Sequence, residues 1–254
     1  MNARLLLGVF YKTAMEFVTL GILTIIFIAT LVRSTFGFGE SLIAVPLLIF
    51  FIPMDIAVPL SVLISIVIAG IVVIQDRKEI HFNSAKWLIL FAFLGIPIGL
   101  FLLVYGNEQF VKSVLGIFII LYAVYSLFSA NTFKLQSDNK VWLFFCGFLS
   151  GVFGGAYGIN GPPLVIYGNM RRWSPKHFRA TLQAYFLPAS ILGMIGYWYK
   201  GLWTPTVTEY FLLSVPVVVP AIFLGRYLNR RLKGETFLKY VYVGLVLIGI
   251  LLLV

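Results

Sequence analysis

Two glycine-rich stretches carry most of the residues that could bind a ligand in this chain. Residues 36–50 read FGFGESLIAVPLLIF, and residues 153–167 read FGGAYGINGPPLVIY. Glycine lets the backbone approach a ligand closely, and the first N–H groups of a helix are unpaired and attract anions. Two helices that restart after such breaks and face each other would therefore form a site for a small anion. Close helix packing, which also uses small residues, is the alternative interpretation.

The candidate substrate-binding residues lie in these stretches and in the apolar segment 178–199. They are Gly37, Gly39, Ser41, Tyr157, Gly158, Asn160, Gly161, Gln183 and Tyr185. The Asn160 amide can donate to an anion, or it can cap the helix that begins at Gly161. The Tyr157 hydroxyl can likewise donate to a ligand, or the side chain can serve as an anchor at the membrane interface.

Some polar side chains sit in otherwise apolar segments. Gln183 and Tyr185 belong to segment 178–199, and Ser61 and Ser65 lie one helical turn apart in segment 55–74. These side chains can line a substrate pathway. Hydrogen bonds between helices are at least as good an interpretation of them.

Glu40 and Arg33 flank the first break, and ionisable groups at membrane depth are usually functional. A carboxylate near a helix start also interacts favourably with the helix dipole. An ionised Glu40 would repel a bound anion, so its protonation is a candidate mechanism for coupling protons to the substrate. Arg33 is a candidate for contact with the anion or for an anchor at the cytoplasmic headgroups, and the anchor is the favoured interpretation.

The sequence indicates neither a metal site nor an enzyme. Cys146 is the only cysteine, His177 has no partner at metal-ligand spacing, and HExxH, GxSxG and P-loop sequences are absent. No cofactor is therefore predicted, and transport would have to be driven by a gradient. The net charge of +10 is explained by loops that orient a membrane protein rather than by nucleic-acid binding.

The segments that position these residues are too apolar for a soluble domain. Hydrophobic residues make up 61% of the 254, and the mean hydropathy is +1.00. The apolar segments expected are 15–33, 38–52, 55–74, 87–105, 110–128, 141–153, 161–170, 178–199, 206–225 and 236–253. Because a helix needs about 20 apolar residues to cross a bilayer, segments 38–52 and 161–170 are short, and both spanning and re-entry stay open for them. The sequence predicts an all-α polytopic membrane protein embedded in the lipid bilayer.

The basic residues are distributed unequally between the two sets of loops. Thirteen lie in the loops at 75–86, 129–140, 168–180 and 225–235: Arg77, Lys78, Lys86, Lys134, Lys140, Arg171, Arg172, Lys176, Arg179, Arg226, Arg230, Arg231 and Lys233. Four lie on the opposite side: Arg4, Lys12, Lys112 and Lys200. Cytoplasmic loops carry the excess of Lys and Arg, so the first set is predicted to be cytoplasmic and both termini to lie outside.

The two halves of the chain resemble each other. When residues 36–50 are aligned with 153–167, five of fifteen positions are identical: Phe36/Phe153, Gly37/Gly154, Pro46/Pro163, Leu47/Leu164 and Ile49/Ile166. Five segments in each half place the second copy in the opposite orientation, so we expect two inverted-topology repeats, each with a helix pair that is broken by Gly or Pro or is re-entrant. The units are a lead-in (1–14), repeat 1 (15–130), a cytoplasmic linker (131–140) and repeat 2 (141–254).

The segments GFGESLIAVPLL (37–48) and GGAYGINGPPLVIYG (154–168) resemble the two signature segments of the TauE/SafE family of sulfite-exporter-like membrane permeases. The resemblance extends from about residue 20 to residue 252. It implies transport of a sulfur-containing anion such as sulfite, sulfoacetate or another organosulfonate, and it leaves the substrate and the direction of transport open.

These observations favour a secondary transporter of a small anion in the inner (plasma) membrane of a bacterium. The anion would bind between the two broken-helix starts near the bilayer midplane, with protons as a candidate coupling partner. An anion channel, in which the same helix ends line a pore, is the alternative. The oligomeric state stays open.

Overall fold

The computed structural model describes residues 3–128 and 134–229, together with residues 242, 243, 246, 247, 250 and 253. Within this part of the chain the regular structure is entirely helical. Five helical stretches are long and apolar enough to cross a membrane: Glu16–Phe36, Met54–Glu79, Phe82–Tyr105, Lys140–Tyr157 and Pro205–Asn229. The predicted all-α membrane protein is thus confirmed. Most of the expected segment 236–253 and residues 131–133 of the linker lie outside the described residues.

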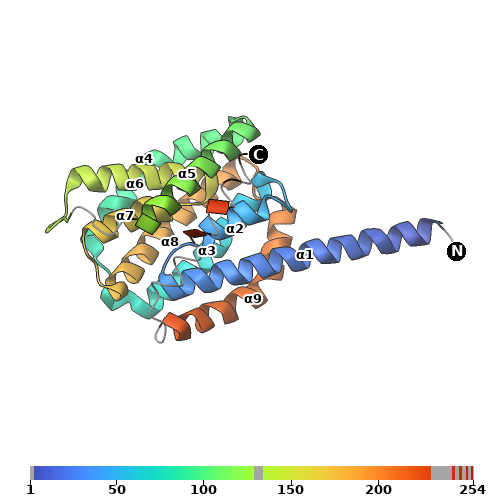
Figure 1. The fold of residues 1–254 in the computed structure, drawn as a ribbon, viewed down its shortest axis with the longest axis horizontal. Helices are drawn as coiled ribbons and strands as arrows, with labels where there is room; N and C mark the ends of the chain where they lie inside the picture. The colour runs from blue at the N-terminus through green and yellow to red at the C-terminus, as the bar shows by residue number, and fades with distance from the viewer. Residues whose placement is uncertain are drawn as a thin grey trace.

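The helices follow one another in a simple order (Figure 1). They are α1 (Ala3–Phe36), α2 (Glu40–Leu48), α3 (Met54–Asp76), α4 (Phe82–Tyr105), α5 (Glu108–Phe128), α6 (Lys140–Tyr157), α7 (Gly161–Met170), α8 (Pro175–Tyr199) and α9 (Pro205–Asn229), with a 3-10 turn, η1, at Arg77–Glu79. The boundary expected between residues 14 and 15 lies inside the continuous helix α1.

Two long-helix pairs enclose the short helices. In Figure 1, α4, α5 and α6 lie along one side of the molecule and α1 and α9 along the other, with α2, α3, α7 and α8 between them. α4 packs along α6, α1 along α9, and α3 against α8. The two short helices α2 and α7 are therefore enclosed by longer helices, which supply buried side chains around the points where they begin.

Glycines allow α4 and α6 to pack with their backbones in contact. A Cβ atom added at Gly99 would meet the carbonyl oxygen of Val152, and one added at Gly155 would meet that of Ile96. Gly151 lies equally close to Ala92. Small residues one turn apart are a common means of close helix packing in membranes. Part of the glycine-rich stretch in the second half therefore serves packing.

Asp138 ties the segment before α6 to the ends of two other helices. Its carboxylate accepts hydrogen bonds from Ser84 Oγ at 2.9 Å, Asn83 Nδ2 at 3.1 Å and Tyr167 Oη at 2.8 Å, and it pairs with Arg171 Nε at 3.2 Å. Burial alone would raise the pKa of Asp138, but the donors of Tyr167, Ser84 and Asn83 and the charge of Arg171 together lower the pKa below its ordinary value.

Asp138→Ala is expected to lower stability by about 1–3 kcal/mol, because the buried donors Ser84 and Tyr167 lose their acceptor. The apparent melting temperature of the detergent-solubilised protein should fall by several degrees, and Glu209→Ala, an exposed acid of α9, should leave it unchanged. Since the folded-state pKa of Asp138 lies below its ordinary value, its contribution is present above that ordinary value and is lost as the pH falls through the folded-state pKa. Equal melting temperatures for the two variants would contradict this role.

Candidate functional site

The first helix break lies between α1 and α2. Gly37 and Gly39 have φ values of 89° and 99°, in the left-handed region that glycine adopts without strain. No side chain caps α2, and its first intrahelical bond joins Ile43 N to Gly39 O. The N–H groups of the first three residues of α2 therefore have no partner within the helix, and they carry the positive end of its dipole.

The second break lies between α6 and α7. α6 ends at Tyr157 and is followed by Gly158, which has a φ of 68° and whose N–H donates to Gly154 O at 2.9 Å. α7 then begins at Gly161 with two prolines in its first turn. Proline has a fitting φ for this position but no N–H, so the start of α7 offers fewer backbone donors than the start of α2.

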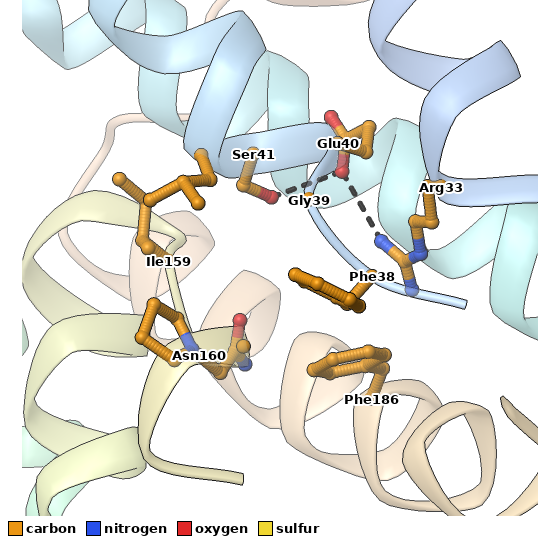
Figure 2. Close-up of a pocket in the computed structure, with 11 residues that line it drawn as sticks. Arg33, Phe38, Gly39, Glu40, Ser41, Ile159, Asn160 and Phe186 are labelled. Atoms are coloured by element: carbon orange, nitrogen blue, oxygen red, sulfur yellow. Dashed lines mark hydrogen bonds and ion pairs between the residues drawn. The ribbon is translucent and has the colours of Figure 1, made fainter. Parts of the chain in front are cut away.

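The two helix starts meet at one pocket, shown in Figure 2. Its volume is about 290 Å³, part of which is open to the outside. The enclosed part is much smaller, about 20 Å³, so only a small ligand fits there. The lining residues are Arg33, Phe38, Gly39, Glu40, Ser41, Leu42, Ile159, Asn160, Gly161, Pro162 and Phe186.

Asn160 presents a polar side chain to the pocket. It is 8% exposed and precedes α7, but its side chain makes no capping hydrogen bond. Its backbone carbonyl is held instead by the Ser150 hydroxyl, which donates to it at 2.6 Å. In Figure 2 the amide extends toward the space between the start of α2 and Phe186. The capping interpretation of Asn160 is therefore not observed, and the residue lies in the pocket wall.

Arg33 and Glu40 form a buried ion pair beside the pocket. Arg33 Nη1 lies 3.1 Å from Glu40 Oε2, and the two side chains are 3% and 1% exposed. Glu40 also accepts hydrogen bonds from Ser61 Oγ at 2.8 Å and from Ser41 Oγ at 2.9 Å. Arg33 is thus enclosed by protein, which does not fit the anchor at the headgroups that the sequence favoured.

The guanidinium of Arg33 is positioned by three further side chains. Nη1 donates to Ser65 Oγ at 2.8 Å, and Nη2 donates to Gln183 Oε1 at 2.9 Å. The charge also lies 4.6 Å from the ring centroid of Phe186, a favourable cation–π distance. Residues from α1, α2, α3 and α8 therefore meet around one positive and one negative charge.

The sequence left two interpretations for Gln183 and Ser65, which were lining a substrate pathway and forming hydrogen bonds between helices. In the structure both side chains form hydrogen bonds between helices. Gln183 Nε2 donates to Gly37 O at 2.7 Å, which ties α8 to the first break. Ser65 Oγ lies 3.0 Å from Ser190 Oγ, which ties α3 to α8. Each of them also contacts Arg33, so these bonds fix the position of the guanidinium in the pocket wall.

The structure brings six of the candidate residues to the pocket and leaves five outside its lining. Those that line it are Arg33, Gly39, Glu40, Ser41, Asn160 and Gly161. Those that do not are Gly37, Tyr157, Gly158, Gln183 and Tyr185. Gly37 packs against Arg179, Gly158 lies near Val62, and Tyr185 is fully buried.

Sequence reasoning missed the apolar part of the lining. It consists of Phe38, Leu42, Ile159, Pro162 and Phe186. In a chain that is 61% hydrophobic, such residues carry no signal that separates a pocket wall from a packing surface. All of these residues except Phe186 lie within the two broken segments, so proximity to a break was the one available indication.

The sequence model of a protein family described as Sulfite exporter TauE/SafE matches residues 22–252. The match includes both helix breaks and every residue that lines the pocket. No curated protein and no solved structure gives a significant match to the chain.

Proposed function

The chain belongs to the sulfite exporter TauE/SafE family of membrane transporters for sulfur-containing anions, and on this premise we propose that it is a secondary transporter of one such small anion. Sulfite, sulfoacetate and other organosulfonates are the candidate substrates. The observation that carries the proposal is the pocket at which the starts of α2 and α7 meet. The substrate binds there, between the two helix starts.

The electrostatics of the pocket favour an anion. Each helix start carries roughly half a positive charge from the helix dipole. The Arg33–Glu40 ion pair has no net charge, so the net positive charge at the pocket comes from the helix starts. The Ser41 hydroxyl and the Asn160 amide supply further donors at the pocket wall. A small oxyanion with several acceptor oxygens matches this set of groups.

We also propose that the two halves form inverted-topology repeats with the site near the bilayer midplane. The packing of the helices supports this arrangement. In the two repeats, α1 corresponds to α6 and α4 corresponds to α9. α1 packs along α9, and the corresponding helices α6 and α4 also pack along each other. α3 and α8, the third segments of the two halves, pack against each other. A pseudo-twofold axis between α3 and α8 accounts for all three contacts.

Cysteine labelling tests the orientation of these repeats. In a Cys146→Ser background, Arg172→Cys should be protected from a membrane-impermeant thiol reagent in intact cells, because the loop 168–180 is cytoplasmic. Thr206→Cys, at the opposite end of the helices, should be labelled; both positions are exposed. Permeabilised cells should label both and serve as the control. Labelling of position 172 in intact cells would contradict the orientation and the inverted repeat with it.

Proton coupling through Glu40 completes the proposed function. The carboxylate lines the pocket, and an ionised carboxylate there repels the anion that the helix starts attract. Protonation of Glu40 during binding removes this repulsion, so that one proton travels with the substrate. Neither ATP nor a metal is required.

An anion channel would use the same pocket as part of a continuous pore. Flux of radiolabelled sulfite into vesicles containing the purified protein distinguishes the two functions. A carrier gives slow flux that saturates with sulfite and is accelerated by unlabelled sulfite on the opposite side. Single-pore currents without saturation would favour the channel. Binding measurements with sulfite, sulfoacetate and taurine identify the substrate, and failure of all three to bind would contradict the function proposed.

A further inference from the structure

The Arg33–Glu40 ion pair lies in the pocket wall, and we propose that substrate binding exchanges the partner of Arg33. With the anion bound, the guanidinium pairs with the anion, while the Glu40 carboxylate takes up a proton from solution and forms an O–H bond. No bond within the anion breaks. This inference rests on the proposed transport function and deepens it, because it makes Arg33 the residue that links the anion to the proton.

Arg33 is held firmly but is not saturated with hydrogen bonds. Nη1 donates to Glu40 and Ser65, and Nη2 donates to Gln183. Among the described residues, the buried Nε–H has no hydrogen-bond partner. A guanidinium has five N–H donors and binds an oxyanion through two parallel bonds. Ser65 and Gln183 can keep the guanidinium in the pocket wall when its bond to Glu40 breaks. The donor released from Glu40 and the unpaired donors can then bind the anion.

The partners of Glu40 suit both of its protonation states. Ser61 donates to one carboxylate oxygen and Ser41 to the other. A hydroxyl can donate to a carboxylate, or it can rotate its hydrogen and accept from a carboxylic acid. A backbone N–H could only donate. Glu40 therefore keeps hydrogen bonds on both oxygens after it gains a proton and loses Arg33.

The charge balance of the site requires a proton when an anion enters. Within the described part of the chain, Arg33 is the only charged group within ion-pair distance of Glu40. Both side chains are almost completely buried, so the pair is neutral and little water screens it. The partial charges of the helix starts offset an added anion only in part, and the remaining negative charge is costly in this environment. One proton on Glu40 removes one negative charge, which gives one proton for each anion bound.

A double-mutant cycle with sulfite as the probe tests the exchange. Sulfite affinity is measured for purified wild type, Glu40→Gln, Arg33→Gln and the double variant, each checked by size-exclusion chromatography. Glu40→Gln should bind sulfite about tenfold more tightly, because the competitor for Arg33 is gone, and Arg33→Gln about 100-fold more weakly. In the Arg33→Gln background, Glu40→Gln should have no further effect.

Each other result has a definite meaning. If Glu40→Gln tightens sulfite binding equally in the wild-type and Arg33→Gln backgrounds, Glu40 only repels the anion. If it tightens sulfite binding in neither background, the ion pair stays intact when sulfite binds. Both results overturn the exchange. Failure of wild type to bind sulfite, sulfoacetate and taurine contradicts the proposed function and this inference together, and if only one of the latter two binds, that anion replaces sulfite as the probe in the cycle. Binding without coupling between the two positions contradicts this inference alone.

A spectroscopic measurement on the wild-type protein keeps the test valid if Arg33→Gln does not fold. Infrared difference spectra recorded on addition of sulfite should show loss of a carboxylate band, gain of a protonated carboxyl band, and a shift of the guanidinium bands in protein that carries isotope-labelled arginine. Glu40→Gln should lack the two carboxyl changes. Unchanged carboxyl and guanidinium bands in sulfite-bound wild type would overturn the exchange.

Discussion

Replacing Gly161 with leucine is expected to weaken sulfite binding by at least ~100-fold, a loss of about 2.7 kcal/mol. Gly161 is the first residue of α7 and lines the pocket. Pro162 and Pro163 follow it and have no N–H, so Gly161 is the only one of the first three residues of α7 that has a backbone donor. A leucine side chain would occupy the space that the anion needs beside this donor. Affinity is measured on protein that elutes as a single folded species.

Two control variants distinguish a blocked anion site from a misfolded protein. An alanine Cβ at Gly161 would have Phe38 Cβ as its nearest neighbour at 3.9 Å, an ordinary contact, so Gly161→Ala should fold and keep most of the affinity. Gly193→Leu changes another glycine, in α8, where nothing lies within 4 Å of an added Cβ, and it should bind sulfite normally. Normal affinity of folded Gly161→Leu would contradict a site at the start of α7.

Gly158 is a weaker test of the same site, although it also lies in the second break. Its φ of 68° penalises any other residue, and an added Cβ would lie 3.1 Å from Val62 Cγ2. It does not line the pocket. A loss of binding in Gly158→Leu would therefore reflect distortion of the turn between α6 and α7, and it would not locate the anion.

The positions of the helix breaks could be predicted from the sequence because they depend on local backbone chemistry. Positive φ at Gly39 and Gly158 and prolines in the first turn of α7 are properties of single residues and their neighbours. The match between the two broken segments also predicted that they would belong together. Both breaks line one pocket in the structure, which is the geometry on which the proposed anion site depends.

The pairing of Arg33 could not be predicted in the same way. Arg33 and Glu40 are seven positions apart, with the helix break at Gly37–Gly39 between them, so helical spacing says nothing about their distance. Gln183 reaches Arg33 across 150 positions of sequence, through the packing of α8 on α3. Contacts of this kind depend on how helices are placed relative to one another, and hydropathy does not contain that information.

The glycines of α4 and α6 had a signal that sequence reasoning did not use. Gly95 and Gly99 lie four residues apart, as do Gly151 and Gly155, and each pair forms a small-residue stripe on one helix face. The structure packs the two stripes together. The glycine-rich second half therefore combines two functions, with packing before the break and the pocket after it.

Glu40→Gln is expected to abolish proton-driven sulfite transport while exchange of sulfite for sulfite continues. Glutamine has the shape of a protonated Glu40 and can keep hydrogen bonds with Ser61 and Ser41, but it neither gains nor loses a proton. Transport driven by a pH gradient requires proton uptake at each turnover, whereas exchange requires only that the loaded site reach both sides. Flux is measured in vesicles with an imposed pH gradient, and exchange in vesicles with equal pH on both sides.

Proton uptake by Glu40 also predicts the direction in which sulfite affinity changes with pH. If the bound state holds one more proton than the free state, linkage requires that sulfite affinity rise as the pH falls through the range in which Glu40 titrates. Glu40→Gln removes this proton, so its affinity should follow only the ionisation of sulfite itself, and the difference between the two proteins isolates Glu40. Glu209→Gln, at an exposed position of α9, should behave as wild type. Full proton-driven flux in Glu40→Gln would show that Glu40 serves only as a partner for the start of α2 and for Arg33.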